Sequence, residues 1–468
     1  MSNLRAWLAK QSPSKQKNFL GESPRLSVDG QEFDQYCRLL ANYDFIAAKI
    51  NHPLFGVQAL IEDYDLLDDV LATSSEYTGT FKALKFILLA LRLPANFKYT
   101  KPAKALKLIQ GALRLSAHIL NEDKNQLSTQ LAGRLLGFNH PQIKGLRQQI
   151  IATQHTGFRC LTSSLIPPGG ALIRTLEGHS NSVKAVAISA DCQFVISGSD
   201  DKTIKVWDLK SRREKFTLSG HSDSVNAVVI SADGQFVISG SRDKTIKVWD
   251  VKSGREKFTL SGHSDWVNAV AISADCQFVI SGSGNKTIKV WDVKSGREKF
   301  TLSGHSNSVK AVAISADDQF VISGSSDSTI KVWDLKSGRE KFTLSGHSDR
   351  VNAVVISADG QFVLSGSSDE TIKVWDFKSR REKFTLSGHS SGVNAVAISA
   401  DCQFVISGSD DKTIKVWDLK SREEIATFTG ESPIFCCAVA PDSKTIVAGE
   451  KSGRLHFLRL EGIGGNDE

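Results

Sequence analysis

Long apolar segments are missing from this chain of 468 residues. Uninterrupted apolar runs such as 86–91 are far shorter than the roughly 20 residues that span a bilayer. The first residues also lack the apolar core and the small-residue cleavage site of a secretory signal. We therefore predict a cytoplasmic protein without a membrane span.

Motifs for cofactor chemistry are missing too. The seven cysteines are odd in number and contain no C-x-x-C pair, so neither a disulfide framework nor a zinc site is indicated. The chain has no H-E-x-x-H motif and no G-x-x-x-x-G-K-[ST] phosphate loop. A G-x-S-x-G match around Ser390 lies in a repeated turn and not in the strand-to-helix elbow that a nucleophile needs. We predict that the chain is not an enzyme and uses no cofactor or metal.

Positive charge is concentrated in one part of the chain. The net charge of +7 arises within the first 170 residues, and the remainder is neutral. Between Glu76 and Glu122 there are basic residues and no acidic ones, and the candidate anion-binding group is Lys98, Lys101, Lys104 and Lys107. Nucleic-acid phosphates could bind this group. No nucleic-acid-binding motif accompanies it, and such lysines also form the solvated face of a helix, so nucleic-acid binding is only the alternative function.

An internal repeat of 42 residues occupies the rest of the chain. Each of six copies contains a Gly-His pair, a tight turn that has Asp in all but one copy, and a Trp-Asp pair at constant offsets. The third copy has Asn285 in place of the turn Asp, and a seventh, degenerate copy begins at Gly430. The repeated residues are His179, Asp201, Trp207, His221, Asp243, Trp249, His263, Trp291, His305, Asp327, Trp333, His347, Asp369, Trp375, His389, Asp411 and Trp417.

This pattern resembles the WD-repeat β-propeller family over residues 171–461. The resemblance implies seven blades of four antiparallel strands around a channel. It also implies that each His, Asp and Trp are joined by buried hydrogen bonds through a strand serine such as Ser197, which is a structural role. We expect the third and seventh blades to be the least rigid. The segment 172–176 has the fourth-strand sequence, so we expect it to complete the last blade and remove an exposed edge.

The first third of the chain is predicted to be helical. Apolar spacing near 3.6 predicts about six amphipathic helices within residues 34–157. Residues 1–33 are expected to be loosely ordered, 158–170 to form a linker, and 462–468 to form a tail. The predicted fold is therefore an all-β seven-bladed propeller preceded by an all-α helical domain.

The helical phrases 43–50 and 108–118 resemble the segment that precedes the propeller in cyanobacterial-type signalling ATPases related to apoptotic protease-activating factor. Those proteins join an ATPase, a helical arm and a WD-repeat sensor. This chain has no phosphate loop. The resemblance therefore implies an arm and a sensor without the ATPase domain, acting alone or in trans with a separate signalling ATPase.

Positions that differ between near-identical copies are not set by blade geometry, so they are candidates for partner contacts. They lie in loops that map to one face, around the channel mouth, where the WD-repeat resemblance implies partner binding. Trp and Arg are enriched at binding hot spots, whereas neutral drift among copies is the alternative. The candidates are Trp266, Arg350, Arg242, Lys184, Lys310, Asn226, Asn268, Asn352 and Asn394. We predict a scaffold or sensor that binds a protein partner in signalling or complex assembly.

Overall fold

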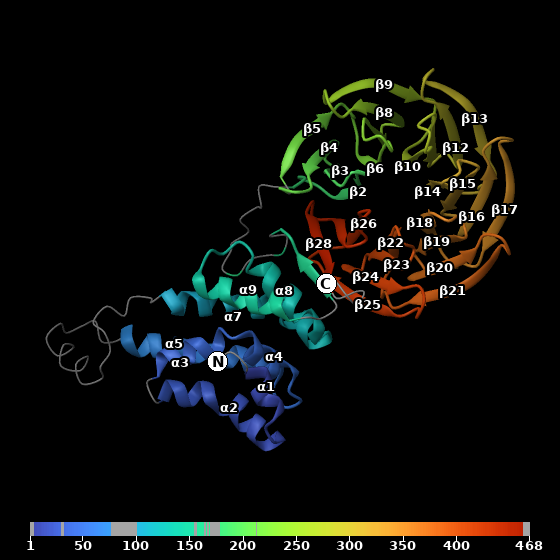
Figure 1. Ribbon diagram of the computed structural model, residues 1–468. Helices are drawn as coiled ribbons and strands as arrows, with labels where there is room; N and C mark the ends of the chain where they lie inside the picture. The colour runs from blue at the N-terminus through green and yellow to red at the C-terminus, as the bar shows by residue number, and fades with distance from the viewer. Residues whose placement is uncertain are drawn as a thin grey trace. The chain divides into compact units, whose positions relative to one another are not determined.

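The chain divides into a helical unit and a propeller unit (Figure 1). The helical unit comprises Met1–His155 and Leu165–Ile173, and the propeller unit comprises Thr156–Ser164 and Arg174–Glu468. The structure, a computed structural model, describes residues 4–29, 32–75, 101–153, 157–162, 165, 168, 178–211 and 213–461. Within these residues no helix is long and apolar enough to cross a membrane.

The helical unit begins earlier than the sequence predicts. Residues 4–29, which we expected to be loosely ordered, form two helices because Leu4, Leu8 and Leu20 are buried in the core of the unit. The described helices are α1 (Leu4–Ala9), α2 (Pro13–Asp29), α3 (Phe33–Leu40), α4 (Tyr43–Asn51), α5 (Gly56–Ser75), α7 (Lys101–Glu122), α8 (Leu127–Arg134) and α9 (Pro141–Ala152), with the 3-10 helix η2 (Lys124–Gln126).

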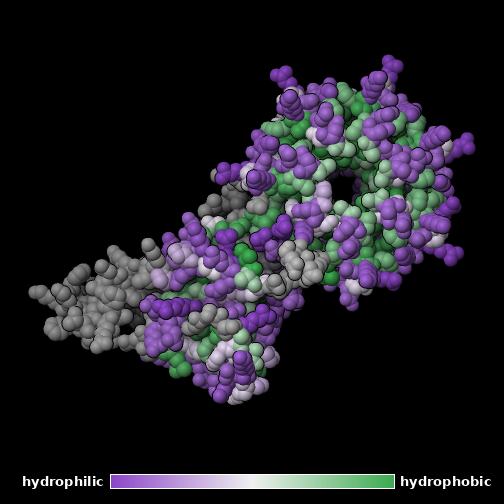
Figure 2. All heavy atoms as spheres, viewed as in Figure 1, coloured by the Kyte–Doolittle hydropathy of each residue, from purple (hydrophilic) through white to green (hydrophobic). Residues whose placement is uncertain are grey.

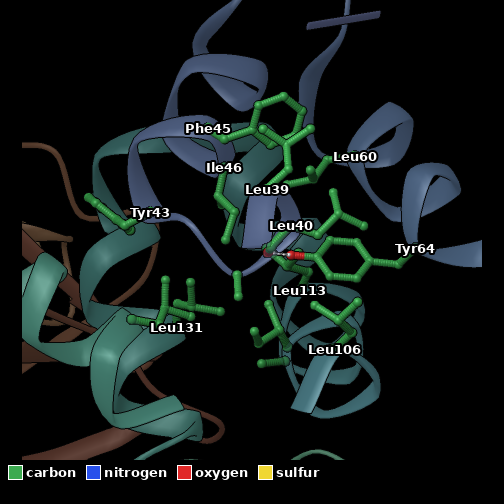
Figure 3. Packing of buried hydrophobic residues seen from close by; sticks show 14 of the residues in the cluster. Leu39, Leu40, Tyr43, Phe45, Ile46, Leu60, Tyr64, Leu106, Leu113 and Leu131 are labelled. Carbon is green, nitrogen blue, oxygen red and sulfur yellow. Dashed lines mark hydrogen bonds between the residues drawn. The ribbon is translucent and has the colours of Figure 1, made fainter. Parts of the chain in front are cut away.

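The core of the helical unit is apolar with a few enclosed polar contacts (Figure 3). The Tyr64 hydroxyl donates a hydrogen bond of 2.5 Å to the carbonyl of Leu40. Lys49 on α4 places its Nζ 2.5 Å from Oδ2 of Asp63 on α5, and both side chains are buried. Burial raises the pKa of Asp63 to about 6, although Lys49 opposes the shift.

The predicted seven-bladed propeller is confirmed: the structure has seven four-stranded antiparallel sheets. Figure 2 shows an open channel through the propeller unit. The strands are β1 (Gly157–Cys160), β2 (Val183–Ile188), β3 (Phe194–Ser199), β4 (Thr203–Asp208), β5 (Glu214–Ser219), β6 (Val225–Ile230), β7 (Phe236–Ser241), β8 (Thr245–Asp250), β9 (Arg255–Ser261), β10 (Val267–Ile272), β11 (Phe278–Ser283), β12 (Thr287–Asp292), β13 (Arg297–Ser303), β14 (Val309–Ile314), β15 (Phe320–Ser325), β16 (Thr329–Asp334), β17 (Arg339–Ser345), β18 (Val351–Ile356), β19 (Phe362–Ser367), β20 (Thr371–Asp376), β21 (Arg381–Ser387), β22 (Val393–Ile398), β23 (Phe404–Ser409), β24 (Thr413–Asp418), β25 (Glu424–Thr429), β26 (Ile434–Val439), β27 (Thr445–Glu450) and β28 (Leu455–Glu461).

Burial changes systematically from the channel to the outer edge of each blade. The first strands of neighbouring blades contact one another around the ring, and the second strands are buried along most of their length. The outer strands are largely exposed, as β9 illustrates. Neighbouring blades pack so closely that a Cβ added to Gly198 would lie 2.7 Å from Cγ1 of Val225 in the next blade. The loops before the first strands are therefore held at the channel mouth by tight packing beneath them.

The last blade is closed by β1, which pairs antiparallel with β28. The expectation that 172–176 supplies this strand is wrong, because β1 comes from the stretch predicted to be a linker; residues 172–176 themselves lie outside the described residues. Phe158 and Cys160 of β1 are buried, and the Phe158 ring contacts Phe428 of the sixth blade edge to face. This apolar burial explains why a short strand suffices to cover the sheet edge.

Candidate functional site

A chain of buried hydrogen bonds joins the repeated residues of the first blade. Trp207 Nε1 donates to Ser197 Oγ at 2.8 Å, and that oxygen lies 2.7 Å from His179 Nε2. Nδ1 of His179 lies 2.8 Å from Asp201 Oδ2. Because the Asp201 carboxylate only accepts, Nδ1 of His179 carries the ring proton and donates it to Asp201, and Nε2 accepts the hydrogen of Ser197 Oγ.

The same contacts recur in the second, fourth, fifth and sixth blades. Burial lowers the pKa of His305 and of His347, so these rings are neutral. Burial raises the carboxyl pKa in the same networks, but hydrogen bonds from the paired histidine and threonine outweigh it and lower the pKa of Asp327 to about 2. Both ring nitrogens of each of these histidines are engaged in hydrogen bonds within its own blade. Among the described residues no cluster of His, Cys, Asp or Glu is arranged to hold a metal.

The third blade reverses this hydrogen-bond chain. Asn285 Oδ1 accepts the Thr287 N–H at 3.1 Å, so its Nδ2 faces Nδ1 of His263 at 3.4 Å. An amide nitrogen only donates, hence Nδ1 of His263 accepts, and the ring proton sits on Nε2, 2.7 Å from Ser281 Oγ. Burial lowers the pKa of His263 to about 4, so the ring is neutral. His263 is therefore the opposite tautomer of its repeat equivalents.

We predict that Asn285→Asp returns His263 to the common tautomer. Long-range ¹H–¹⁵N spectra of the histidine-labelled chain should show the proton on Nε2 in the parent and on Nδ1 in the variant. The new charge-assisted bond should stabilise the third blade by about 1.5–3 kcal/mol at neutral pH, measured by hydrogen exchange. An aspartate paired this way has a lowered pKa, so the gain is present above about pH 4 and is lost in stronger acid. Unchanged His263 signals would contradict the assignment.

The seventh blade contains a different buried pair, which the sequence analysis missed. Glu450 is wholly buried, and its Oε1 lies 2.8 Å from Nε2 of His456 and accepts the Glu431 N–H at 2.8 Å. Burial raises the pKa of Glu450, but His456 outweighs this and the net shift is downward. The carboxylate thus accepts from the loop backbone, as the turn aspartates do elsewhere. The available signal was a glutamate at the end of the largely apolar strand β27 and a histidine between apolar residues of β28.

Four of the predicted partner-binding residues connect neighbouring blades instead. Each asparagine donates its side-chain N–H to a first-strand carbonyl of the next blade at 2.9–3.1 Å. These residues are Asn226, Asn268, Asn352 and Asn394. These bonds join neighbouring blades at four of the junctions, which gives the asparagines a structural role, whereas the equivalent residue in the first and fourth blades is a lysine. We therefore remove them from the candidate binding set.

The remaining candidates group at the channel mouth, where Trp266 is 46% exposed. The Arg242 guanidinium, from the neighbouring second blade, lies 4.7 Å from the centre of the Trp266 ring. The Trp266 backbone is fixed, since its carbonyl accepts the Gly284 N–H at 2.8 Å. Lys310 and Arg350 come from the fourth and fifth blades, and the charges of Arg350 and Arg242 act on Lys310. We call Arg242, Trp266, Lys310 and Arg350 the mouth cluster.

Residues 170–458 match the family described as "Nucleolar protein 10-like, N-terminal domain", a β-propeller family. The chain belongs to this family. Its repeats and its seven sheets identify it as a WD-repeat propeller.

Curated relatives of this WD-repeat propeller match over short stretches only. Vegetative incompatibility protein HET-E-1 of Podospora anserina is 47% identical over 64 residues, which are 14% of this chain and 5% of that protein. Nuclear distribution protein PAC1 of Scheffersomyces stipitis is 33% identical over 113 residues, 18% of this chain and 22% of that protein. Transcriptional repressor rco-1 of Neurospora crassa is 46% identical over 50 residues, 11% and 8% respectively. The chain thus spans less than a quarter of the length of each of these relatives.

The candidate anion-binding group of the helical unit lies partly outside the described residues. Lys98 is not among them, and the side chain of Lys101 is not described. Lys104 is exposed on α7, whereas Lys107 donates to Gln110 at 3.1 Å. On the same helix Arg114 pairs with Asp65 at 2.5 Å. Part of the positive charge is thus already engaged within the helical unit, and nothing here favours nucleic acid over a protein partner of the propeller.

Proposed function

We propose that the chain is a non-catalytic scaffold that holds a protein partner on the channel-mouth face of its propeller. The exposed Trp266 carries this proposal. Burying a large aromatic ring against a partner contributes strongly to binding, and here the ring is already oriented by Arg242 and by its fixed backbone. The six Trp-Asp tryptophans, in contrast, are all buried inside the blades.

We propose that the scaffold acts in signalling or in complex assembly. The resemblance of the helical phrases to the arm of signalling ATPases supports a partner of that class, acting in trans. The chain has no phosphate loop of its own, so nucleotide chemistry would belong to the partner. A cytoplasmic location stays a prediction, which microscopy of the tagged chain checks.

Site-specific photocrosslinking in the native cell tests the proposed face. In one variant a photoreactive residue replaces Asn307, which is exposed at the channel mouth before β14. In the other variant it replaces Lys252, which is exposed in the turn between β8 and β9, at the opposite end of the propeller. We expect discrete protein adducts from position 307 and none of the same adducts from position 252. Adducts that form equally at both positions would contradict a partner-binding face at the mouth.

The contribution of the aromatic anchor is tested separately. Trp266→Ala should weaken capture of the crosslinked partner at least tenfold. Trp7→Ala is the matched control, because Trp7 is 44% exposed but lies in the helical unit. The control variant should retain the partner. An unchanged partner yield with Trp266→Ala would contradict the assigned anchor.

A further inference from the structure

Asp318 bridges the third and fourth blades at the end of the propeller opposite the channel mouth. It lies in the turn between β14 and β15, and its Oδ1 accepts the N–H of Ala274, in the equivalent turn of the third blade, at 2.9 Å. Its Oδ2 accepts the N–H of Asp275 from the same turn at 3.3 Å. One carboxylate thus connects two blades through both of its oxygens.

Cysteine occupies this turn position in three other blades. The backbone there has nearly the same left-handed conformation as at Asp318, where φ is 55°; φ is 58° at Cys276 and 55° at Cys402. The side chains therefore leave the backbone in the same direction, toward the preceding blade. The cysteines are Cys192 in the first blade, Cys276 in the third and Cys402 in the sixth, whereas the second and fifth blades have glycine.

The two N–H groups that hold Asp318 recur opposite Cys276 and Cys402. Each receiving turn has the same Ser-Ala-Asp sequence, and its aspartate accepts the N–H two residues later at 2.9–3.0 Å. The equivalents of Ala274 and Asp275 are Ala232 and Asp233 in the second blade, opposite Cys276, and Ala358 and Asp359 in the fifth blade, opposite Cys402. A thiol is only a weak acceptor for such donors. The reduced chain therefore holds the N–H pair strongly at the Asp318 junction and weakly at the two cysteine junctions.

Cys192 shows that a thiol at this position meets the turn of the preceding blade. Burial raises the pKa of Cys192, the negative charge of Asp442 in the seventh blade raises it further, and the Asp442 N–H opposes the shift. Asp442 is the equivalent of Asp275, so this thiol and the Asp318 carboxylate face the same N–H group of their neighbours. The residue before Asp442 is Pro441, which has no N–H, so this junction offers one donor instead of two.

We propose that Cys276 and Cys402 are oxidation sites, at which hydrogen peroxide converts the thiol into a sulfinate that bridges to the preceding blade as Asp318 does. A sulfinate, like a carboxylate, has two oxygens that share one negative charge, so it can accept both N–H groups. Both cysteines are partly exposed, which gives a small oxidant access. This modification site lies at the other end of the propeller from the proposed partner-binding face and does not depend on it.

The oxidation consumes two molecules of hydrogen peroxide for each cysteine. The thiolate sulfur attacks one peroxide oxygen, the O–O bond breaks and hydroxide leaves, which gives a sulfenic acid. The sulfur then attacks a second peroxide in the same way and gives the sulfinate. The thiol and two H₂O₂ thus yield the sulfinate, one proton and two waters; sulfur loses four electrons, and each peroxide gains two.

Treatment of the full chain with hydrogen peroxide, followed by peptide mass spectrometry, tests the sites. We expect Cys276 and Cys402 to gain two oxygens first. Cys192 should react about fivefold more slowly, because its raised pKa leaves less thiolate and its junction has one donor. Cys37 is the buried control: burial raises its pKa to about 12, and it should stay a thiol in the folded chain. Oxidation of Cys276 and Cys402 no faster than that of Cys37 overturns the proposal.

Hydrogen exchange tests the bridge between the blades. Oxidation should slow exchange of the Ala232 and Asp233 amides by about fivefold or more, and should leave Ala274 unchanged because Asp318 already holds it. Cys276→Asp should give the same protection without peroxide, whereas Cys276→Ser should gain none when peroxide is added. Formation of the sulfinate at Cys276 without slower exchange of the two amides overturns the proposal, as does unchanged exchange in Cys276→Asp.

Discussion

Lys49→Met lowers the free energy of unfolding of the helical unit by about 3–5 kcal/mol. The substitution keeps the length of the side chain but removes the ammonium that lies 2.5 Å from Asp63. Lys49 is 2% exposed, so water cannot replace the lost partner and the carboxylate is left buried and unpaired. Hydrogen exchange of the α4 and α5 amides in the full chain measures the loss.

The double variant Lys49→Met/Asp63→Leu is the control, and it should recover most of the stability because the buried charge is removed as well.

The pH dependence of stability gives a second check. The folded-state pKa of Asp63 is raised from 3.8 to about 6, so the helical unit loses stability as pH rises through about 6 and is most stable near pH 4 as far as this group is concerned. The double variant should lack this dependence. A loss of under about 1 kcal/mol in Lys49→Met would show that the pair is not held as described.

Trp333→Ala should destabilise the propeller by about 3–5 kcal/mol. Trp333 is 2% exposed and packs with Ile288 and Val309, so its removal opens a cavity between the third and fourth blades. It also deprives Ser323 Oγ of a hydrogen bond of 2.8 Å. Denaturant unfolding followed by hydrogen exchange in β14 and β15 measures the effect.

Trp266→Ala is the matched control for this experiment, because the same residue type is removed from an exposed site. Its loss should cost about 0.5–1 kcal/mol at most, the contribution of an exposed cation–π contact with Arg242. Equal destabilisation by the two substitutions would contradict the separation between structural and binding tryptophans. The comparison therefore tests the site assignment as well as the fold.

The repeat made the arrangement of the propeller blades predictable from the sequence. Six copies with constant spacing specify six similar blades, because each copy carries its own histidine, serine and tryptophan, with a turn aspartate in all but the third copy, and local spacing brings them together. The closing strand was not predictable in this way. The four residues of β1 carry no repeat signature. The strand is recognisable only by its pairing with β28, which lies near the C-terminal end of the sequence.

The variable positions show the same division. Sequence comparison of the copies selected Trp266 and the asparagines alike, since both differ between repeats. The structure separates them, because Asn268 reaches the Val309 carbonyl of the next blade whereas Trp266 remains exposed. It also supplies the Glu450 and His456 pair, whose partners come together only when β27 and β28 align.

The sequence by itself determined the number of blades, the helical character of the first third and the hydrogen-bonded residues within each repeat, since these depend on periodicity and on contacts within one copy. Only the tertiary structure decided which strand closes the ring and which variable residues face the solvent. These features depend on contacts between residues far apart in the chain, which no local pattern encodes.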